Sequence, residues 1–432
     1  MSADKKTSPW SWIPTLYVAE GLPNILVASV SVVFYKNLGM SNAAIAFYTG
    51  WLYLPWVIKP LRSPVVDILK TRRQWIWAMQ FFIGAGLAGV ALTIPAPHFF
   101  QWTLFFFWLL AFSSATHDIA ADGFYMLATT EGEQSFFVGI RNAFYRVATI
   151  LAQGQLVIFA GKIHSRTGNY ASAWSTAFAF VAAIFFCLGV YHWLVLPRPA
   201  GDQPGRAAPK DFFAEFFRTF GTFFQKPEIG VMLGFILLYR LGEAQLVKMF
   251  QPFLLDPRAV GGLGLTNDQL GLVYGYVGVP VFILGALLGG FAVARHGLKF
   301  WLWPMLVAIH LPDAVFIWLA SAQPQNLFAI GAGVAVEQFG YGFGFTAFML
   351  YMIRIARGPH TTAHYALCTG FMALGMMLPG MWSGWLQEQL GYKLFFIWVI
   401  LATIPSFLVA AKIPLEPEFG KRQSTDARNK LL

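Results

Sequence analysis

Apolar runs of about 20 residues recur along the whole chain and are separated by shorter polar segments. Each run is long enough to cross a bilayer as an α-helix, which needs about 20 mainly apolar residues. The pattern predicts an all-α polytopic membrane protein with twelve spans. These lie approximately at residues 11–35, 41–61, 74–95, 99–127, 135–161, 171–196, 227–255, 266–294, 299–320, 325–353, 361–387 and 391–412.

The polar segment between the sixth and seventh predicted spans is unusually long. Its first half is rich in Pro, Gly and charge, and from Asp211 onwards its phenylalanines are spaced as in an amphipathic helix lying on a membrane. We therefore expect a six-helix half (1–196), a cytoplasmic linker (197–226), a second six-helix half (227–414) and a cytoplasmic tail (415–432). Twelve spans divided in this way are the layout of the major facilitator fold.

Composition agrees with a membrane protein and narrows its partners. The chain is 57% hydrophobic and 12% charged, whereas about 25% charged residues is usual in soluble domains. The net charge of +10 does not predict nucleic-acid binding, because most Lys and Arg residues fall at the ends of spans that face one side. By the positive-inside rule, this bias predicts that both termini are cytoplasmic.

Other compositional signals exclude further classes of protein. The two cysteines, Cys187 and Cys368, fall within apolar runs, which argues against a disulfide scaffold or a cysteine zinc site. No G-x-x-x-x-G-K-[ST] motif for ATP is present. We expect no cofactor, and the energy for any transport must come from an ion or solute gradient.

The two halves share a short internal repeat. "SNAAIAFYTGWLYLP" from Ser41 and "TNDQLGLVYGYVGVP" from Thr266 have an asparagine, a glycine and a proline at matching positions. Further on, "SPVVDILKTRR" stands opposite "GGFAVARHGLK", and the basic residues of these loops are placed to cap helix C-termini at the inner surface. The predicted gating residues are Asp67, Arg72, Arg73 and Arg295.

Ionisable residues within spans are rare and usually mark a transport pathway or a proton relay. Asp118 and Asp122 lie four apart in the fourth span and therefore share one helix face. Two carboxylates at this spacing in a low dielectric cannot both ionise cheaply, so one is expected to carry a proton. We predict a proton-coupling pair, with Arg146 as counter-ion and His117 tuning it. A static clamp between two helices is the alternative.

The second half contains a matching set of polar residues. In "YRLGEAQ", Arg240 and Glu243 share a helical face, and Glu337 stands in span ten where Asp118 stands in span four. Pro23, beside Glu20 in "EGLPNIL", breaks the first span, and such a break can expose backbone groups to a solute. The predicted substrate-binding residues are Glu20, Asn24, Arg240, Glu243, Glu337 and His364.

Several fragments resemble one branch of the major facilitator superfamily. "ATHDIAADGFY" resembles the span-four signature of the AmpG-type muropeptide permeases and the related acetyl-CoA transporters, and "YRLGEA", "PFLLD", "GALLGG" and "TTAHYALCTGFMALG" also fit. The resemblance implies proton-driven import of N-acetylglucosamine–anhydro-N-acetylmuramyl peptides across a bacterial inner membrane; relatives carry siderophores or acyl-CoA. His117 and His364 replace glutamines that are usual in that family, and a histidine can gain a proton near neutral pH.

The leading hypothesis is therefore a monomeric secondary transporter that imports an amino-sugar or muropeptide-type solute with protons by alternating access. A siderophore or an acyl-CoA-type solute is the alternative. A second class is a membrane-embedded enzyme, because His360 and His364 are spaced like two metal ligands. A third class is a sensor or scaffold that keeps the fold without moving a solute.

Overall fold

The structure, a computed structural model, describes residues 7–203 and 209–421, apart from a few side chains within these ranges. The described part is helical and contains no strand. The first half holds α1 (Ile13–Ile25), α2 (Ser31–Asn37), α3 (Asn42–Trp51), α4 (Leu54–Val57), α5 (Lys59–Leu69), α6 (Arg72–Thr93), α7 (Phe99–Ala128), α8 (Glu131–Ile150), α9 (Val157–Thr167) and α10 (Tyr170–Val195).

The linker forms α11 (Pro209–Phe224), as the spacing of its phenylalanines predicts. The side chains of Phe212, Phe213 and Phe216 lie outside the described part. The second half holds α12 (Ile229–Leu238), α13 (Leu241–Leu255), α14 (Asn267–Leu270), α15 (Val279–His296), α16 (Leu298–His310), α17 (Ala314–Ala322), α18 (Leu327–Ala356), α19 (Thr361–Leu401) and α20 (Ile404–Ala410).

Ten helical stretches of the described residues are long and apolar enough to cross a membrane, which confirms an all-α membrane protein. They differ from the predicted spans in two places. The span predicted at 41–61 is divided into α3, α4 and α5, and Pro55 and Pro60 stand at the starts of α4 and α5, because proline is tolerated in a first helical turn but not further in. The last two predicted spans form one stretch that turns at Gly391, whose φ of 72° favours glycine.

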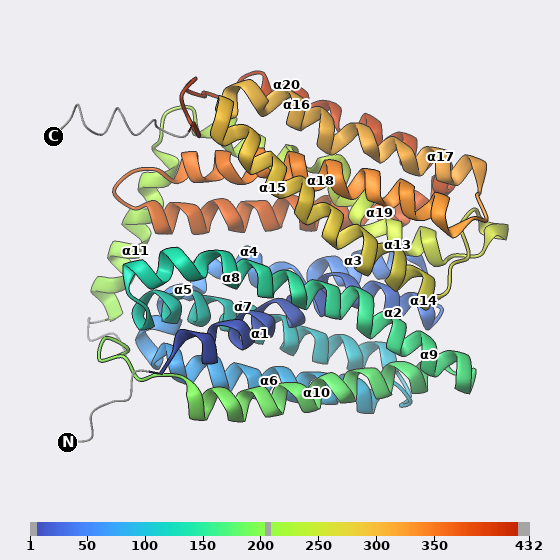
Figure 1. The fold of residues 1–432 in the computed structure, drawn as a ribbon, viewed down its shortest axis with the longest axis horizontal. Coiled ribbons are helices and arrows are strands. Elements are labelled where there is room, and N and C mark those ends of the chain that lie inside the picture. The colour runs from blue at the N-terminus through green and yellow to red at the C-terminus, as the bar shows by residue number, and fades with distance from the viewer. Residues whose placement is uncertain (1–6, 204–208, 422–432) are drawn as a thin grey trace.

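The helices form two bundles, the first below the second in Figure 1, and α11 lies at one end of both. In the first bundle α6 packs against α7 and α10, and α1 packs against α8; in the second, α18 packs against α15 and α16, and α13 against α19. Buried aromatic rings fill both interiors, for example Phe34 with Trp174 and Tyr239 with Phe348. At its end of the molecule α11 contacts α5 and α19, one helix from each half.

The two halves are joined at the end of the molecule opposite α11. Lys36 of the first half forms an ion pair of 2.5 Å with Asp256 of the second half. Asn42 accepts a hydrogen bond from Lys36 and donates to Asp256, Gln387 and Tyr392. All five side chains are largely buried, so this network closes one end of the space between the halves.

The internal repeat supplies contacts between the halves. Asn42 reaches the second half as described, and its counterpart Asn267 donates to Asn37 of the first half over 2.6 Å. The repeated glycines do the same: a Cβ atom on Gly50 would lie 2.4 Å from Met381 Cγ, and one on Gly275 would lie 2.2 Å from Gly154 Cα. A larger residue at either glycine would therefore push the halves apart.

A chain of buried hydrogen bonds joins four helices inside the first half. Thr15 Oγ1 lies 3.0 Å from His192 Nε2, His192 Nδ1 lies 2.8 Å from Gln80 Oε1, and Gln80 Nε2 lies 2.9 Å from His117 Nε2. With this amide orientation, Gln80 donates to His117 and accepts from His192. Both histidines are fully buried, so they are expected to be neutral and to hold α1, α6, α7 and α10 together.

Replacing Asp256 by alanine is expected to open the joined end, because Lys36 and Asn42 lose their charged partner. At about 1.5–3 kcal/mol for each hydrogen bond to a charged group, the ratio of open to closed molecules should rise at least about tenfold. Pulsed electron spin resonance between spin labels at the exposed residues 166 and 260, one on each half, would measure the opening. Asp202→Ala is a matched control, since Asp202 is equally buried and its described hydrogen bonds come from Arg72 and Arg73 of the first half. An unchanged distance distribution in Asp256→Ala would contradict this role of the network.

The hydrogen-bonded chain predicts different effects for two substitutions of His117. Glutamine can still accept from Gln80 and should change the free energy of unfolding by less than about 1 kcal/mol. Alanine leaves the Gln80 amide unsatisfied and should lower that free energy by about 1–3 kcal/mol. Unfolding in detergent micelles measures both values, and a shifted pH dependence of transport in His117→Gln would show that His117 does more than join helices.

Candidate functional site

A cavity of about 810 Å³ lies between the two halves. Its lining extends from Tyr274 and Phe250 to Arg72 and Thr362, which stand at the first residues of α6 and α19 at the α11 end of the molecule. Residues of the first, fourth, fifth, seventh, tenth and eleventh predicted spans line it. The second also contributes, through Tyr53, α4 and α5, and the eighth through Tyr274 and α15.

The first half contributes a cluster of carboxylates and cations. Asp118 accepts a hydrogen bond of 3.0 Å from the indole of Trp56 and lies 3.8 Å from Lys59. Asp122, one helical turn further, forms an ion pair of 3.1 Å with Arg141. Asp118 and Asp122 both line the cavity, as their spacing predicted. The Arg141 guanidinium also lies over the rings of two tyrosines, Tyr17 and Tyr125.

Glu20 is the third carboxylate of this cluster. It stands in α1 beside Pro23, lines the cavity, and is 8% exposed. Its Oε2 atom has no hydrogen-bond partner among the described residues. Among the described residues, the ion pairs of this cluster join Lys59 to Asp118 and Arg141 to Asp122, so Glu20 is the carboxylate without an ion-pair partner. Asn24, one turn further along α1, lines the same cavity and accepts a hydrogen bond of 3.3 Å from Tyr145.

Arg146 is not the counter-ion of the aspartates, contrary to expectation. The guanidinium carbon of Arg146 lies 4.6 Å from the ring centroid of Phe282, in the second half. The cause is helix geometry: at 3.6 residues per turn, Arg141 and Arg146 point about 140° apart around α8. Arg141 therefore faces α7, whereas Arg146 faces the opposite half. His117, the expected tuning residue, is also not part of the cavity lining, because it packs against Gln80.

Arg240 and Glu243 meet in the second half as predicted from their spacing. Two hydrogen bonds join them, at 2.8 and 3.2 Å, and Arg240 also donates to the hydroxyl of Tyr341. Arg240 lines the cavity just before the start of α13, and Glu243 is fully buried behind it. Arg240 therefore faces the cavity, and the buried Glu243 holds its guanidinium in place.

Two residues expected to bind substrate lie elsewhere. Glu337 is 3% exposed and accepts a hydrogen bond of 2.9 Å from Gln338, and it is Gln338, one residue further along α18, that lines the cavity. His364 stands near the start of α19 with its Nε2 atom 3.1 Å from the hydroxyl of Thr222 in α11. His364 therefore joins the linker helix to the second half, while its neighbour Tyr365 faces the cavity.

The predicted gating residues lie near the α11 end. The backbone N–H groups of Arg72 and Arg73 donate to Asp202, which caps α6. The Arg73 side chain donates to the carbonyl oxygen of Leu196 at the C-terminus of α10, the kind of capping contact expected from the loop sequence. Arg295 is exposed in the last turn of α15, and the side chain of Asp67 lies outside the described part.

Wide, π-helical turns interrupt the spans around the closed end of the cavity, a feature often found at functional sites. They lie at Leu26–Val30, Leu151–Leu156 and Gly271–Gly278. The hydroxyl of Ser29, in the first, accepts hydrogen bonds from Gln153 of the first half and Gln251 of the second. Ser29 and Gln153 line the cavity, and sequence reasoning missed both, since serine and glutamine within a span give little signal.

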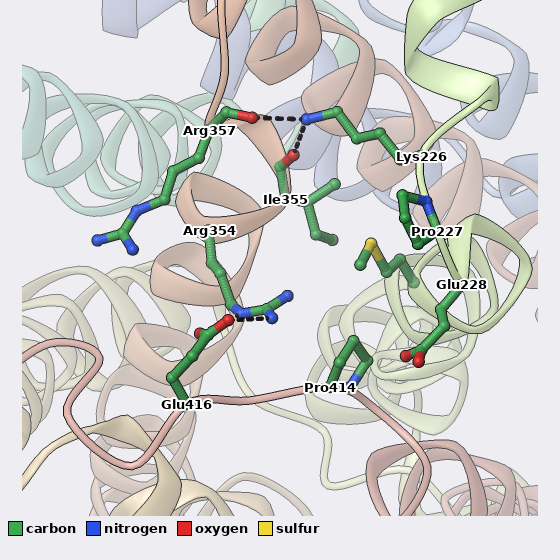
Figure 2. A pocket seen from close by; sticks show the side chains of 9 residues that line it. Lys226, Pro227, Glu228, Arg354, Ile355, Arg357, Pro414 and Glu416 are labelled. Atoms are coloured by element: carbon green, nitrogen blue, oxygen red, sulfur yellow. Dashed lines mark hydrogen bonds and ion pairs between the residues drawn. The ribbon is translucent and has the colours of Figure 1, made fainter.

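A second cavity, of about 450 Å³, lies at the α11 end of the second half (Figure 2). Lys226 donates to the carbonyl oxygen of Ile355 at the end of α18 and to that of Arg357 just beyond it. Arg354 donates twice to Glu416, at 2.7 and 2.6 Å, and these bonds lower the pKa of Glu416 to about 2. Arg354 bonds to Glu416 and the Arg357 guanidinium lies over the ring of Phe419, so these arginines anchor the segment after α20.

The structure offers no support for a metal centre in the part of the chain that it describes. The rings of His360 and His364 lie 5.9 Å apart, but His364 is engaged with α11. Among these residues, no three His, Cys, Asp or Glu side chains come together in a group that could hold a metal ion. Of the two histidines whose spacing suggested a metalloenzyme, His364 instead packs α19 against α11.

Comparison with known proteins identifies relatives along nearly the whole chain. Residues 20–139 match the family described as BT1. The chain is 25% identical to the anhydromuropeptide permease of Escherichia coli, over 90% of this chain and 77% of the permease. It is 23% identical to the putative transporter AmpG 4 of Rickettsia conorii, over 91% of this chain and 94% of that protein.

Solved structures show the same fold. A bacterial homolog of the human lysosomal transporter Spinster, in an inward-facing and unoccupied conformation, superposes with a TM-score of 0.67 at 16% identity, covering 95% of this chain and 96% of that one. These findings confirm the predicted major facilitator fold, and the names of the relatives agree with a transporter rather than an enzyme. The chain is a multi-pass membrane protein with the major facilitator fold, similar along nearly its whole length to AmpG-type permeases.

Proposed function

We propose that the protein imports an amino-sugar or muropeptide-type solute, together with protons, across the bacterial inner membrane by alternating access. In this proposal it acts as a monomer with both termini in the cytoplasm, and the α11 end of the cavity is the cytoplasmic end. The observation that carries the proposal is the cluster of Glu20, Asp118 and Asp122 on the wall of a cavity closed at the opposite end.

Proton coupling follows from the charge count of this cluster. Lys59 and Arg141 can compensate two carboxylates, so the third is stable in a low dielectric when it carries a proton. A solute that displaces Lys59 or Arg141 would change which carboxylates need protons. Protonation and solute binding would then depend on each other, which is the requirement for symport.

The choice of solute rests on the cavity walls and on the relatives. The volume of about 810 Å³ lies within the range of about 300–1,000 Å³ usual for small-molecule sites. Aromatic rings that can stack on sugar rings line it from both halves, among them Tyr53, Trp56, Tyr145, Phe250, Tyr274 and Tyr341. One relative is named an anhydromuropeptide permease, and we carry that solute class over as the proposal.

Asp118→Asn and Asp122→Asn should each uncouple transport from the proton gradient, because an amide keeps the shape of the carboxyl group but cannot titrate. With one proton and about 150 mV, coupling can sustain a gradient of about 300-fold, and the variants should only equilibrate the solute. The measurement is uptake and exchange of a labelled N-acetylglucosaminyl–anhydro-N-acetylmuramyl peptide in proteoliposomes; exchange should persist.

Glu416→Gln is the control for this experiment, since Glu416 also pairs with an arginine but lies outside the cavity. Accumulation with normal pH dependence in both aspartate variants would reduce the pair to a helix clamp. The same assay on Glu20→Gln would then show whether the uncompensated carboxylate of α1 carries the proton.

Removing Arg240 should weaken solute binding at least about tenfold, the effect of one lost hydrogen bond to a charged group. The double substitution Arg240→Gln with Glu243→Gln is preferable, because Arg240→Gln alone would leave Glu243 buried without a cation. Glu243→Gln alone keeps the guanidinium and serves as the control. The solute-dependent rise in melting temperature of the purified protein measures the affinity; an unchanged rise in the double variant would remove Arg240 from the site.

A further inference from the structure

The cations that line the cavity differ in whether the protein satisfies them. They are Lys59, Arg72, Arg146 and Arg240. Lys59 faces Asp118 and Arg240 is held by Glu243. Arg72 is engaged as well, and its side chain lies against Gly123. In the described part of the chain, Arg146 alone of these four has neither an ion pair nor a hydrogen bond, and its guanidinium lies over the Phe282 ring.

A contact with an aromatic ring does not satisfy a guanidinium group as an anion would. A cation over an aromatic face gains about 0.5–2 kcal/mol but leaves the five N–H donors of arginine without acceptors. A charged group within a membrane span is otherwise paired or faces a pathway. Arg146 lines the cavity, so the missing acceptor can come from the solute.

The surroundings of Arg146 suit a carboxylate. Tyr274 and Tyr341 lie close to Arg146 and line the same cavity, and their hydroxyl groups can donate hydrogen bonds to an anion. Arginine binds a carboxylate through two parallel N–H···O bonds, a geometry that lysine lacks. Among the described residues, Asp118 and Asp122 of the cluster pair with Lys59 and Arg141 and not with Arg146.

We infer that Arg146 is the binding site for a carboxylate group of the transported solute. Such a solute would be an anion whose acidic group lies where the two halves meet, between α8 and Phe282 of α15. Binding would then neutralise the unpaired guanidinium at the junction that must move during transport. This inference rests on the proposed function, since it concerns the same cavity.

The test uses matched pairs of acids and amides, so that only the anionic charge changes. The probes are an N-acetylmuramyl dipeptide with a free C-terminal carboxylate and its C-terminal amide, and a plain tripeptide as free acid and as amide. Affinities are measured by isothermal titration and by thermal shift on the purified full-length protein. The proteins are wild type, Arg146→Gln, Arg146→Lys and Arg166→Gln, an exposed arginine in the last turn of α9 that does not line the cavity.

The wild type and Arg166→Gln should bind an acid at least about tenfold more tightly than its amide. Arg146→Gln should bind the acid and the amide with similar affinity. Arg146→Lys should still prefer the acid, but by a smaller factor than the wild type. If Arg146→Gln does not fold, this smaller factor in Arg146→Lys is the test. Equal binding of acid and amide by the wild type, an undiminished preference in Arg146→Gln, or no binding of any acid would overturn the inference.

Failure of the proposed function gives a different result. If tripeptide acids bind through Arg146 and muramyl compounds do not bind at all, the proposed solute class is wrong and the carboxylate site stands. If the muramyl acid and amide bind the wild type equally well, the solute class stands and the role of Arg146 is wrong.

Discussion

A charge within a membrane span needs a partner, and where each partner stands determines how this protein can move. The pairs around the cavity lie within one half: Asp118 with Lys59, and Asp122 with Arg141, in the first; Arg240 with Glu243 in the second. The described ion pair that joins the halves is Lys36 with Asp256, at the closed end. Among the described residues, the halves can therefore separate along the cavity without breaking an ion pair, whereas opening the other end must break one.

Beside the cavity, two contacts between the halves are cation–ring contacts, which are weaker than the ion pair at the closed end. Arg146 of the first half lies over Phe282 of the second, and Lys248 of the second lies 5.1 Å from the ring centroid of Tyr53 of the first. The ammonium of Lys248 is buried and has no hydrogen-bond partner among the described residues. Cation–ring contacts are worth about 0.5–2 kcal/mol each, so they can hold one arrangement of the halves and still be exchanged during a transport cycle.

The sequence predicted the scaffold better than the direction of individual side chains. The repeat identified residues that lie between the halves, because Asn42, Asn267, Gly50 and Gly275 all contact the opposite half. The spacing of Asp118 and Asp122 correctly placed both on one face, since that depends on helix geometry alone.

The other side chains depend on how each helix is rotated in the bundle. One residue changes the direction around a helix by about 100°, enough to place Gln338 in the cavity and Glu337 behind it. That rotation is set by packing against helices far away in the chain, which periodicity does not record. The aromatic residues that line the cavity could not be identified from the sequence either, because they are a few among 43 Phe, 16 Trp and 15 Tyr residues.

His117 and His364 stand where the related family usually has glutamine, and their tertiary contacts show what these two differences do. In the sequence they stand as groups that can gain a proton where the family has a neutral amide. In the structure, His117 is bonded to Gln80 and His364 to Thr222, both between helices and outside the cavity lining. A neutral imidazole offers one donor and one acceptor, as an amide group can, so each can serve the hydrogen bond of a glutamine. The departures therefore concern helix packing and the docking of α11, and they give no reason to expect a different solute.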